Sequence, residues 1–170
     1  GSQNFTERII STTANWANDV IAADVDGDGD IDVLSASHFD DKIAWYENDG
    51  SQNFDVRVIT DAAETVHKVF AADMDGDGLK DIVTGKTYWS HHKQSSLWDA
   101  GAVAYWFKLV RTADGVDWIP YQANDDCGVG RQVIVGDVNG DHIPDIVAGG
   151  MKGCHVLIHQ RKKVDRATWE

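Results

Sequence analysis

Three acidic stretches decide the fold: Asp24-Val-Asp-Gly-Asp-Gly-Asp-Ile-Asp32, Asp73-Met-Asp-Gly-Asp-Gly-Leu-Lys-Asp81 and Asp137-Val-Asn-Gly-Asp-His-Ile-Pro-Asp145. All share the frame D-x-[DN]-G-D-x-x-x-D, which places oxygen-bearing side chains at positions 1, 3, 5 and 9. Carboxylates packed this closely repel one another, and we expect no neighbouring Lys or Arg to relieve the repulsion. A hard divalent cation does relieve it, since Ca²⁺ prefers about six to eight oxygen ligands.

The stretches therefore predict about three Ca²⁺ sites, one in each acidic loop. Position 7 is expected to offer its backbone carbonyl, which is why Leu and Ile are tolerated there, and Gly at position 4 permits a sharp turn. The expected ligands are Asp24, Asp26, Asp28, Asp30 and Asp32 in the first loop, Asp73, Asp75, Asp77, Leu79 and Asp81 in the second, and Asp137, Asn139, Asp141, Ile143 and Asp145 in the third. The alternative interpretation, solvated Asp-Gly turns, is disfavoured by three copies in one frame.

The residues after each loop distinguish these sites from EF-hands. An EF-hand has similar early spacing but requires Glu at position 12 and flanking helices. Position 12 here is Ser35, Thr84 or Ala148, and the loops run into Ile-Asp-Val-Leu, Asp-Ile-Val-Thr and Asp-Ile-Val-Ala. Such β-branched runs form strands, so each loop is expected to join one strand to the next.

Internal repetition indicates the architecture. The first two acidic loops lie 49 residues apart, and Gly-Ser-Gln-Asn-Phe occurs at 1–5 and again, also 49 residues on, at 50–54. Four short strands per unit, expected in the first unit at 19–24, 31–37, 42–47 and 54–60, are typical of propeller blades. The predicted fold is all-β, with about three blades of four antiparallel strands. Aromatic residues of the third strands are expected to fill the space between blades.

The loops, the Asp-Ile-Val runs that follow them and Ala44-Trp-Tyr-Glu-Asn-Asp-Gly50 resemble the FG-GAP/VCBS repeat family. This family of calcium-loop propellers includes the integrin α-subunit head and many secreted bacterial proteins, some with carbohydrate-processing domains attached. The resemblance covers about residues 1–160. It implies a propeller, seven-bladed in most members, with Ca²⁺ in the loop between the first two strands of a blade, and it says almost nothing about the ligand.

The expected strands divide the chain into unequal units. Residues 1–11 are expected to be the fourth strand of a preceding or closing blade, 16–60 and 66–122 to be blades, 129–160 to be a blade without its fourth strand, and 161–170 to be a tail or linker. Propellers close with about four to eight blades. The chain is therefore part of a longer propeller, or two chains build one six-bladed ring, or the blade edges stay open; the first is favoured.

A ligand face is expected opposite the acidic loops. The long loop 86–101 carries Tyr88, Trp89, His91, His92 and Trp98, whose rings suit sugars or a protein partner. The alternative is a lid packed on the next blade. Asn18, His67 and Arg131 occupy equivalent positions before the first strands and are expected to approach one another near the axis, as ligand contacts or as the lining of a wet channel.

Composition and motifs limit the function. The net charge of −13 disfavours nucleic acid, no stretch approaches the roughly 20 apolar residues of a membrane span, and no nucleophile–base motif is present. The prediction is a secreted, extracellular or periplasmic calcium-stabilised module, non-catalytic by itself, that binds a carbohydrate or protein in adhesion or scaffolding. The alternatives are an accessory part of a secreted polysaccharide-processing enzyme and a self-assembling unit. Cys127 and Cys154 either form a disulfide or remain free.

Overall fold

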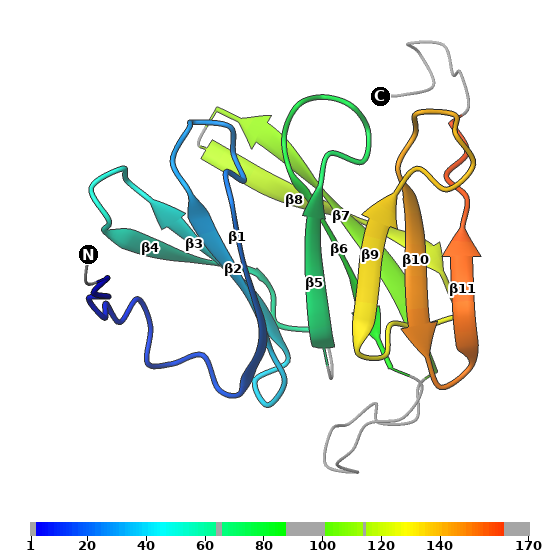
Figure 1. The fold of residues 1–170 in the computed structure, drawn as a ribbon, viewed down its shortest axis with the longest axis horizontal. Coiled ribbons are helices and arrows are strands. Elements are labelled where there is room, and N and C mark those ends of the chain that lie inside the picture. Colours follow the sequence, from blue (N-terminus) through cyan, green and yellow to red (C-terminus); the bar gives the residue numbers. More distant parts are fainter. Residues whose placement is uncertain (1–2, 64–65, 88–100, 114, 162–170) are drawn as a thin grey trace.

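The computed structural model describes residues 3–63, 66–87, 101–113 and 115–161, and their regular secondary structure is entirely β (Figure 1). The strands are β1 (Ala17–Ala23), β2 (Asp32–Ser37), β3 (Lys42–Asn48), β4 (Phe54–Thr60), β5 (Val66–Ala72), β6 (Asp81–Lys86), β7 (Val103–Thr112), β8 (Gly115–Asn124), β9 (Gln132–Gly136), β10 (Asp145–Gly150) and β11 (Gly153–Leu157). Within these ranges we find no helix able to cross a membrane.

The strands form three antiparallel sheets, each built from strands that follow one another along the chain. Their orders are β1-β2-β3-β4, β5-β6-β7-β8 and β9-β10-β11. The predicted all-β fold of antiparallel blade-like units is confirmed. In the first sheet β4 has the predicted bounds, and the other three strands agree with prediction to within two residues.

Residues 3–10, part of the segment 1–11 that is predicted to be the fourth strand of a preceding or closing blade, belong to no sheet in this structure. The sequence of residues 5–10 is similar to that of β4, but β4 is held by backbone hydrogen bonds to β3 along its length. No described strand pairs with residues 5–10, and a strand without a partner leaves its backbone N–H and C=O groups unpaired. The similarity to β4 therefore does not by itself show whether or where residues 5–10 pair.

The sheets pack side by side through two apolar cores, one on each side of the middle sheet. The first core lies between the first and second sheets and consists of Val25, Leu34, Ala36, Ile43, Trp45, Val66, Val69, Ile82 and Leu109. The second lies between the second and third sheets and consists of Met74, Val83, Ala104, Cys127, Val129, Val133, Ile146 and Ala148. Side chains on opposite faces of the middle sheet thus join both neighbours, as expected for inner blade strands.

Aromatic residues of the third strands contribute to these cores as predicted. Trp45 is fully buried in the first core, with its ring edge-on to Trp118 of the second sheet at 6.3 Å. Trp106, at the same place in β7, stacks on Tyr121 at 4.9 Å and packs against the second core. Large aromatic rings thus fill space between adjacent sheets.

The two cysteines are free thiols in this structure. Cys127 is buried in the second core, whereas Cys154 is exposed on β11. Of the two alternatives left open by the sequence, the structure has the free pair.

Candidate metal centres

The three acidic loops occupy the same place in each sheet, between its first and second strands: β1 and β2, β5 and β6, β9 and β10. In Figure 1 these connections lie together at the upper end of the sheets. The antiparallel pairing of the first two strands brings both ends of each nonapeptide together, as in the register partners Ala23 and Asp32. The sheets therefore present all three loops on one face of the molecule.

The carboxylate at position 1 organises the inside of each loop. In the second loop Asp73 accepts hydrogen bonds from the N–H groups of Gly76 at 2.6 Å, Asp77 at 3.1 Å and Gly78 at 3.0 Å. Asp24 and Asp137 accept the N–H groups of positions 4 and 6 in the same way. Several N–H donors on one carboxylate close the backbone into a cup around it.

Positions 4 and 6 of the loops adopt left-handed backbone conformations. The φ angles at position 4 are 77°, 83° and 81° for Gly27, Gly76 and Gly140, which explains glycine there in all three copies. Position 6 has φ of 93° at Gly78 but is occupied by His142, with φ of 64°, in the third loop. The loop conformation is thus the same even where one glycine is replaced.

The carboxylate at position 9 is buried and ties the loop to the third strand. Asp81 accepts the N–H of Met74 at 3.0 Å on one oxygen and that of Leu109 at 3.0 Å on the other. Asp32 and Asp145 bridge the corresponding backbone groups of their sheets. All three acids are almost completely buried. Position 9 therefore has a structural role whether or not a metal is bound, which the sequence frame did not reveal.

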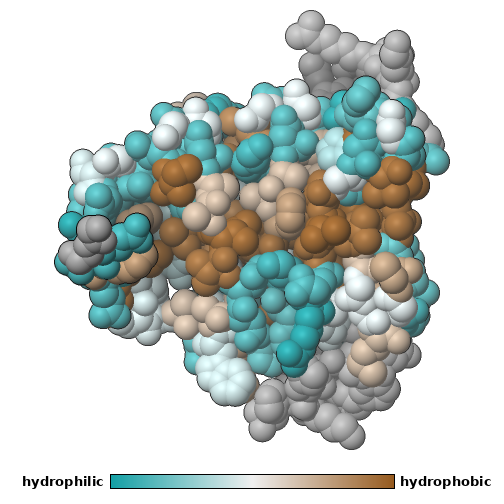
Figure 2. Space-filling model, viewed as in Figure 1, coloured by the Kyte–Doolittle hydropathy of each residue, from teal (hydrophilic) through white to brown (hydrophobic). Residues whose placement is uncertain are grey.

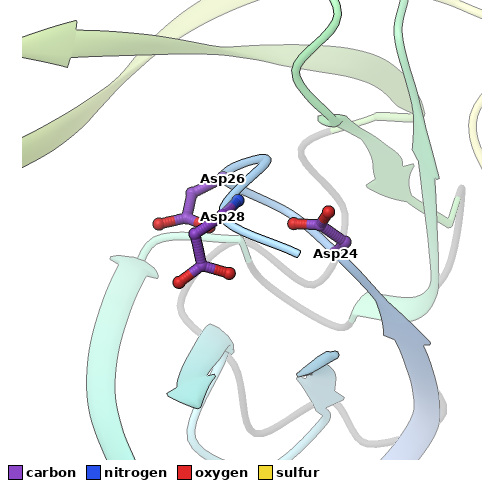
Figure 3. A group of neighbouring side chains, drawn as sticks. All are labelled: Asp24, Asp26 and Asp28. Atoms are coloured by element: carbon purple, nitrogen blue, oxygen red, sulfur yellow. The ribbon is translucent and has the colours of Figure 1, made fainter. Parts of the chain in front are cut away.

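Positions 1, 3, 5 and 9 bring carboxylate oxygens close enough for one ion. In the first loop single oxygens of Asp24, Asp26 and Asp28 all lie within 4.8 Å of one another (Figure 3), and in the second loop those of Asp73, Asp75 and Asp81 do so. Two oxygens that each contact Ca²⁺ at about 2.3–2.6 Å are at most about 5 Å apart. The donor set and its spacing therefore fit a calcium ion, and each oxygen that accepts one N–H keeps a further lone pair.

The third loop offers a weaker donor set. Asn139 takes position 3, so that this loop has one carboxylate fewer, and its amide donates to Asp141 at 2.9 Å. The side-chain oxygen of Asn139 accepts the N–H of Asp141 at 3.0 Å, as the acid does in the other loops. Neutral amide oxygens are also calcium ligands, although they attract the ion less strongly than carboxylates.

Burial makes several of these acids costly to ionise. It raises the pKa of Asp81 to about 6, in spite of the two N–H groups that favour the charged form. Burial also raises the pKa of Asp32, and it raises the pKa of Asp26 together with the neighbouring charge of Asp28. A cation held there would favour the ionised forms, so that its binding would be coupled to deprotonation of these acids.

Basic side chains from distant strands reach the first two loops, and the expectation that no Lys or Arg relieves their repulsion is wrong. Lys108 forms an ion pair with Asp75 and lies 3.4 Å from Asp77. The guanidinium of Arg111 donates to the carbonyl oxygen of Asp26, and that of Arg161 donates to the carbonyl oxygen of Met74 at 3.0 Å. Arg111 lies on β7 of the sheet that follows the first loop, and Arg161 lies four residues after β11 of the sheet that follows the second loop, so only the fold brings them there.

The residues predicted for the opposite face are brought together in part. The side-chain amide of Asn18 and Nδ1 of His67 lie 2.9 Å apart, and the His67 ring stacks on His38 at 4.8 Å. One position further along, Lys68 pairs with Asp19 at 2.8 Å. Arg131 is exposed. The other predicted ligand contacts, Tyr88, Trp89, His91, His92 and Trp98, lie outside the described residues.

Three antiparallel sheets packed face against face through two apolar cores, each with an acidic loop between its first and second strands, define a β-propeller-like module. Residues 24–84, which contain the first two acidic loops, match the family model of the FG-GAP-like repeat, so this part of the chain is similar to that repeat. No curated protein matches the chain significantly.

Proposed function

We propose that the chain is a calcium-stabilised propeller module in which each acidic loop holds one Ca²⁺. The observation that carries the proposal is the clustering of three carboxylate oxygens within 4.8 Å in each of the first two loops. The threefold repetition of the same N–H cup and of the same position-9 bridge extends it to the third loop. The residues that would hold the ions are those at positions 1, 3, 5 and 9.

The role of the ions is structural. Three dications carry six positive charges, so the formal net charge would change from −13 to −7. An ion at positions 1, 3 and 5 would tie the loop together, while position 9 links the loop to the third strand of its sheet. Stabilisation then follows the free Ca²⁺ concentration, because an ion that binds only the folded state adds to the free energy of unfolding.

The module serves extracellular binding or scaffolding in this proposal. FG-GAP repeats are typical of extracellular proteins, and millimolar Ca²⁺ outside cells keeps loops of modest affinity occupied. The ligand is a carbohydrate or a protein, bound on the face opposite the acidic loops by the aromatic segment with Trp89 and Trp98. His67 and Arg131 contribute polar contacts at the edge of that surface.

Thermal unfolding with and without Ca²⁺ tests the metal proposal. Chelator-treated protein is expected to melt many degrees lower than protein in Ca²⁺, and Ca²⁺ is expected to restore the melting temperature more effectively than Mg²⁺. Asp26→Asn should reduce the response to Ca²⁺, whereas Asp55→Asn, which removes the same charge from the exposed strand β4, should leave it unchanged. Equal melting temperatures in Ca²⁺ and chelator would refute the proposal.

A glycan array tests the ligand proposal separately. The protein is expected to retain a defined class of glycan, and Trp98→Ala is expected to lose that binding while the melting temperature in Ca²⁺ stays the same. Loss of binding in chelator alone would show only that the fold depends on the metal. Equal retention by the protein and by Trp98→Ala would rule out this segment as the ligand site.

A further inference from the structure

Equivalent positions of the three sheets differ sharply in burial at one end of the molecule. Val25, Met74 and Val138 all occupy position 2 of their acidic loops. Val25 and Met74 are 0% and 2% exposed because each packs against the following sheet, whereas Val138 is 53% exposed. Val156 on β11 is likewise exposed, although Trp45 at the same place in β3 is fully buried. The third sheet thus presents a face built to pack on a following sheet.

The first sheet presents the complementary face. Val20, Val69 and Val133 lie four residues before position 1 of their loops. Val69 and Val133 are fully buried against the preceding sheet, but Val20 is 58% exposed. Val56 and Val58 on β4 are exposed as well. Figure 2 shows apolar side chains in a broad band over the first strands of the sheets, which continues to the outer part of the third sheet. Exposed apolar faces of this kind mark interfaces.

Two further features complement each other. Among the described residues no strand pairs with the outer edge of β11, where the first two sheets have a fourth strand. Residues 5–10 belong to no sheet, yet they follow the same pentapeptide as β4, and the side chains of Phe5 and Ile9 are exposed. An open edge offers unpaired N–H and C=O groups to any strand that can add to it. This chain carries both the edge and a strand sequence of the type that covers it.

We propose that two copies of the chain assemble into one ring of six sheets, in which residues 5–10 of each copy add to β11 of the other. The first sheet of one copy, with Val20, Val56 and Val58, packs on the third sheet of its partner, with Ile134, Val138 and Val156. A two-fold axis relates the two identical interfaces, which closes the assembly. Six units lie within the range of about four to eight that closes a propeller.

The position-9 bridges fix the register of the added strand. Asn48, Leu109 and His159 are equivalent because each donates its N–H to the buried acid of its sheet. In the first sheet Asn48 lies opposite Phe54 and Trp45 lies opposite Arg57. Phe5 and Arg8 lie 49 residues before Phe54 and Arg57. If residues 5–10 pair with β11 as β4 pairs with β3, Phe5 lies opposite His159 and Arg8 lies opposite Val156. The strand therefore runs antiparallel to β11, as β4 does to β3.

Light scattering of the protein in Ca²⁺ tests the assembly. The expected mass is about twice the 18.7 kDa of one chain. Deletion of residues 1–11, of which the described residues 3–11 belong to no sheet, should leave the far-ultraviolet circular dichroism unchanged and reduce the mass to that of one chain. A one-chain mass for the intact protein, or a deletion variant that remains dimeric, would overturn the proposal.

A disulfide tests the register in the same protein. With Cys154→Ser as background, Arg8→Cys combined with Val156→Cys is expected to give a disulfide-linked dimer under oxidation, because directly opposite residues of an antiparallel pair lie within reach of a disulfide. Glu7→Cys with Val156→Cys is the matched control and should remain unlinked, since neighbouring side chains point to opposite faces. A link within one chain would overturn the proposal. The acidic loops take no part in the pairing, so failure here leaves the calcium proposal standing.

Discussion

The acidic loops at 24–32 and 137–145 have the same internal hydrogen bonds but different surroundings. In the first loop Arg111 of the following sheet donates to the Asp26 carbonyl, and Val25 is buried. The third loop has no such arginine among the described residues, and Val138 is exposed. The conformation of each loop is thus a local property of its nonapeptide, whereas its burial comes from the next sheet. Substitutions can separate the two contributions.

The largest effect is expected where a buried acid holds two backbone groups. Asp81→Ala leaves the N–H groups of Met74 and Leu109 unpaired inside the protein and should lower the free energy of unfolding by about 3 kcal/mol. Asp145→Ala should cost about half as much, because the freed N–H of the exposed Val138 can reach water. Chemical unfolding in chelator measures both costs without a metal contribution. Equal costs would show that the burial of Met74 and the exposure of Val138 make no difference to the bridge.

Position 2 tests the packing contribution alone. Val25→Ala removes two methyl groups from the first core and should destabilise the protein by about 2 kcal/mol. Val138→Ala at the equivalent place should cost less than about 0.5 kcal/mol in a single chain. This difference in cost between Val25→Ala and Val138→Ala is expected in dilute protein, where the chains are monomeric. At concentrations where light scattering shows a dimer, the cost of Val138→Ala should rise, and an unchanged cost there would argue against the end face as an interface.

The arginine that reaches the first loop tests the contact between neighbouring sheets. Arg111→Met keeps most of the apolar stem but removes the donor to the Asp26 carbonyl, and it should cost about 1.5 kcal/mol. Arg131→Met removes the same charge from an exposed position and serves as the control, with little change expected in the urea midpoint. If both variants unfold alike, the contribution of Arg111 is one of net charge and not of the contact.

The smallest expected effect concerns position 6. An added methyl group at Gly78 would meet no atom within 4 Å, so the cost of Gly78→Ala, about 1 kcal/mol, arises from the left-handed backbone with φ of 93°. His142→Gly should change stability by less than about 0.5 kcal/mol, because relief of the same backbone conformation is offset by a more flexible unfolded chain. A large loss on His142→Gly would mean that the imidazole has a role in the loop beyond its backbone.

The local part of the fold could be predicted from the sequence. The repeated frame located the loops, and the β-branched runs after Asp32, Asp81 and Asp145 located the second strands, since both signals depend on near neighbours. The strand at 5–10 could not be judged in this way because a strand needs a partner, and the sequence does not name one. Residues 5–10 resemble β4 in sequence, yet only β4 has a partner strand, β3, in this structure.

The site was predicted less completely than the fold. Spacing predicts ligands at positions 1, 3, 5 and 9, but it does not reveal that position 9 also bridges backbone groups up to 28 residues from the acid. Lys108, Arg111 and Arg161 reach loops that lie 33 to 87 residues away in the chain. Arg111 and Arg161 occupy equivalent places, because each lies two residues after the residue whose N–H donates to a position-9 acid. The first sheet has Gly50 at the equivalent place. That equivalence is visible only once the bridges are known.

The number of calcium ions bound per chain tests the central claim most directly. Equilibrium dialysis of chelator-treated protein against Ca²⁺ should saturate at about three ions per chain, and at about two for Asp24→Asn combined with Asp26→Asn and Asp28→Asn. Saturation at the same value for the protein and this variant, or no bound Ca²⁺ at millimolar concentration, would contradict the assignment of the acidic loops as calcium sites.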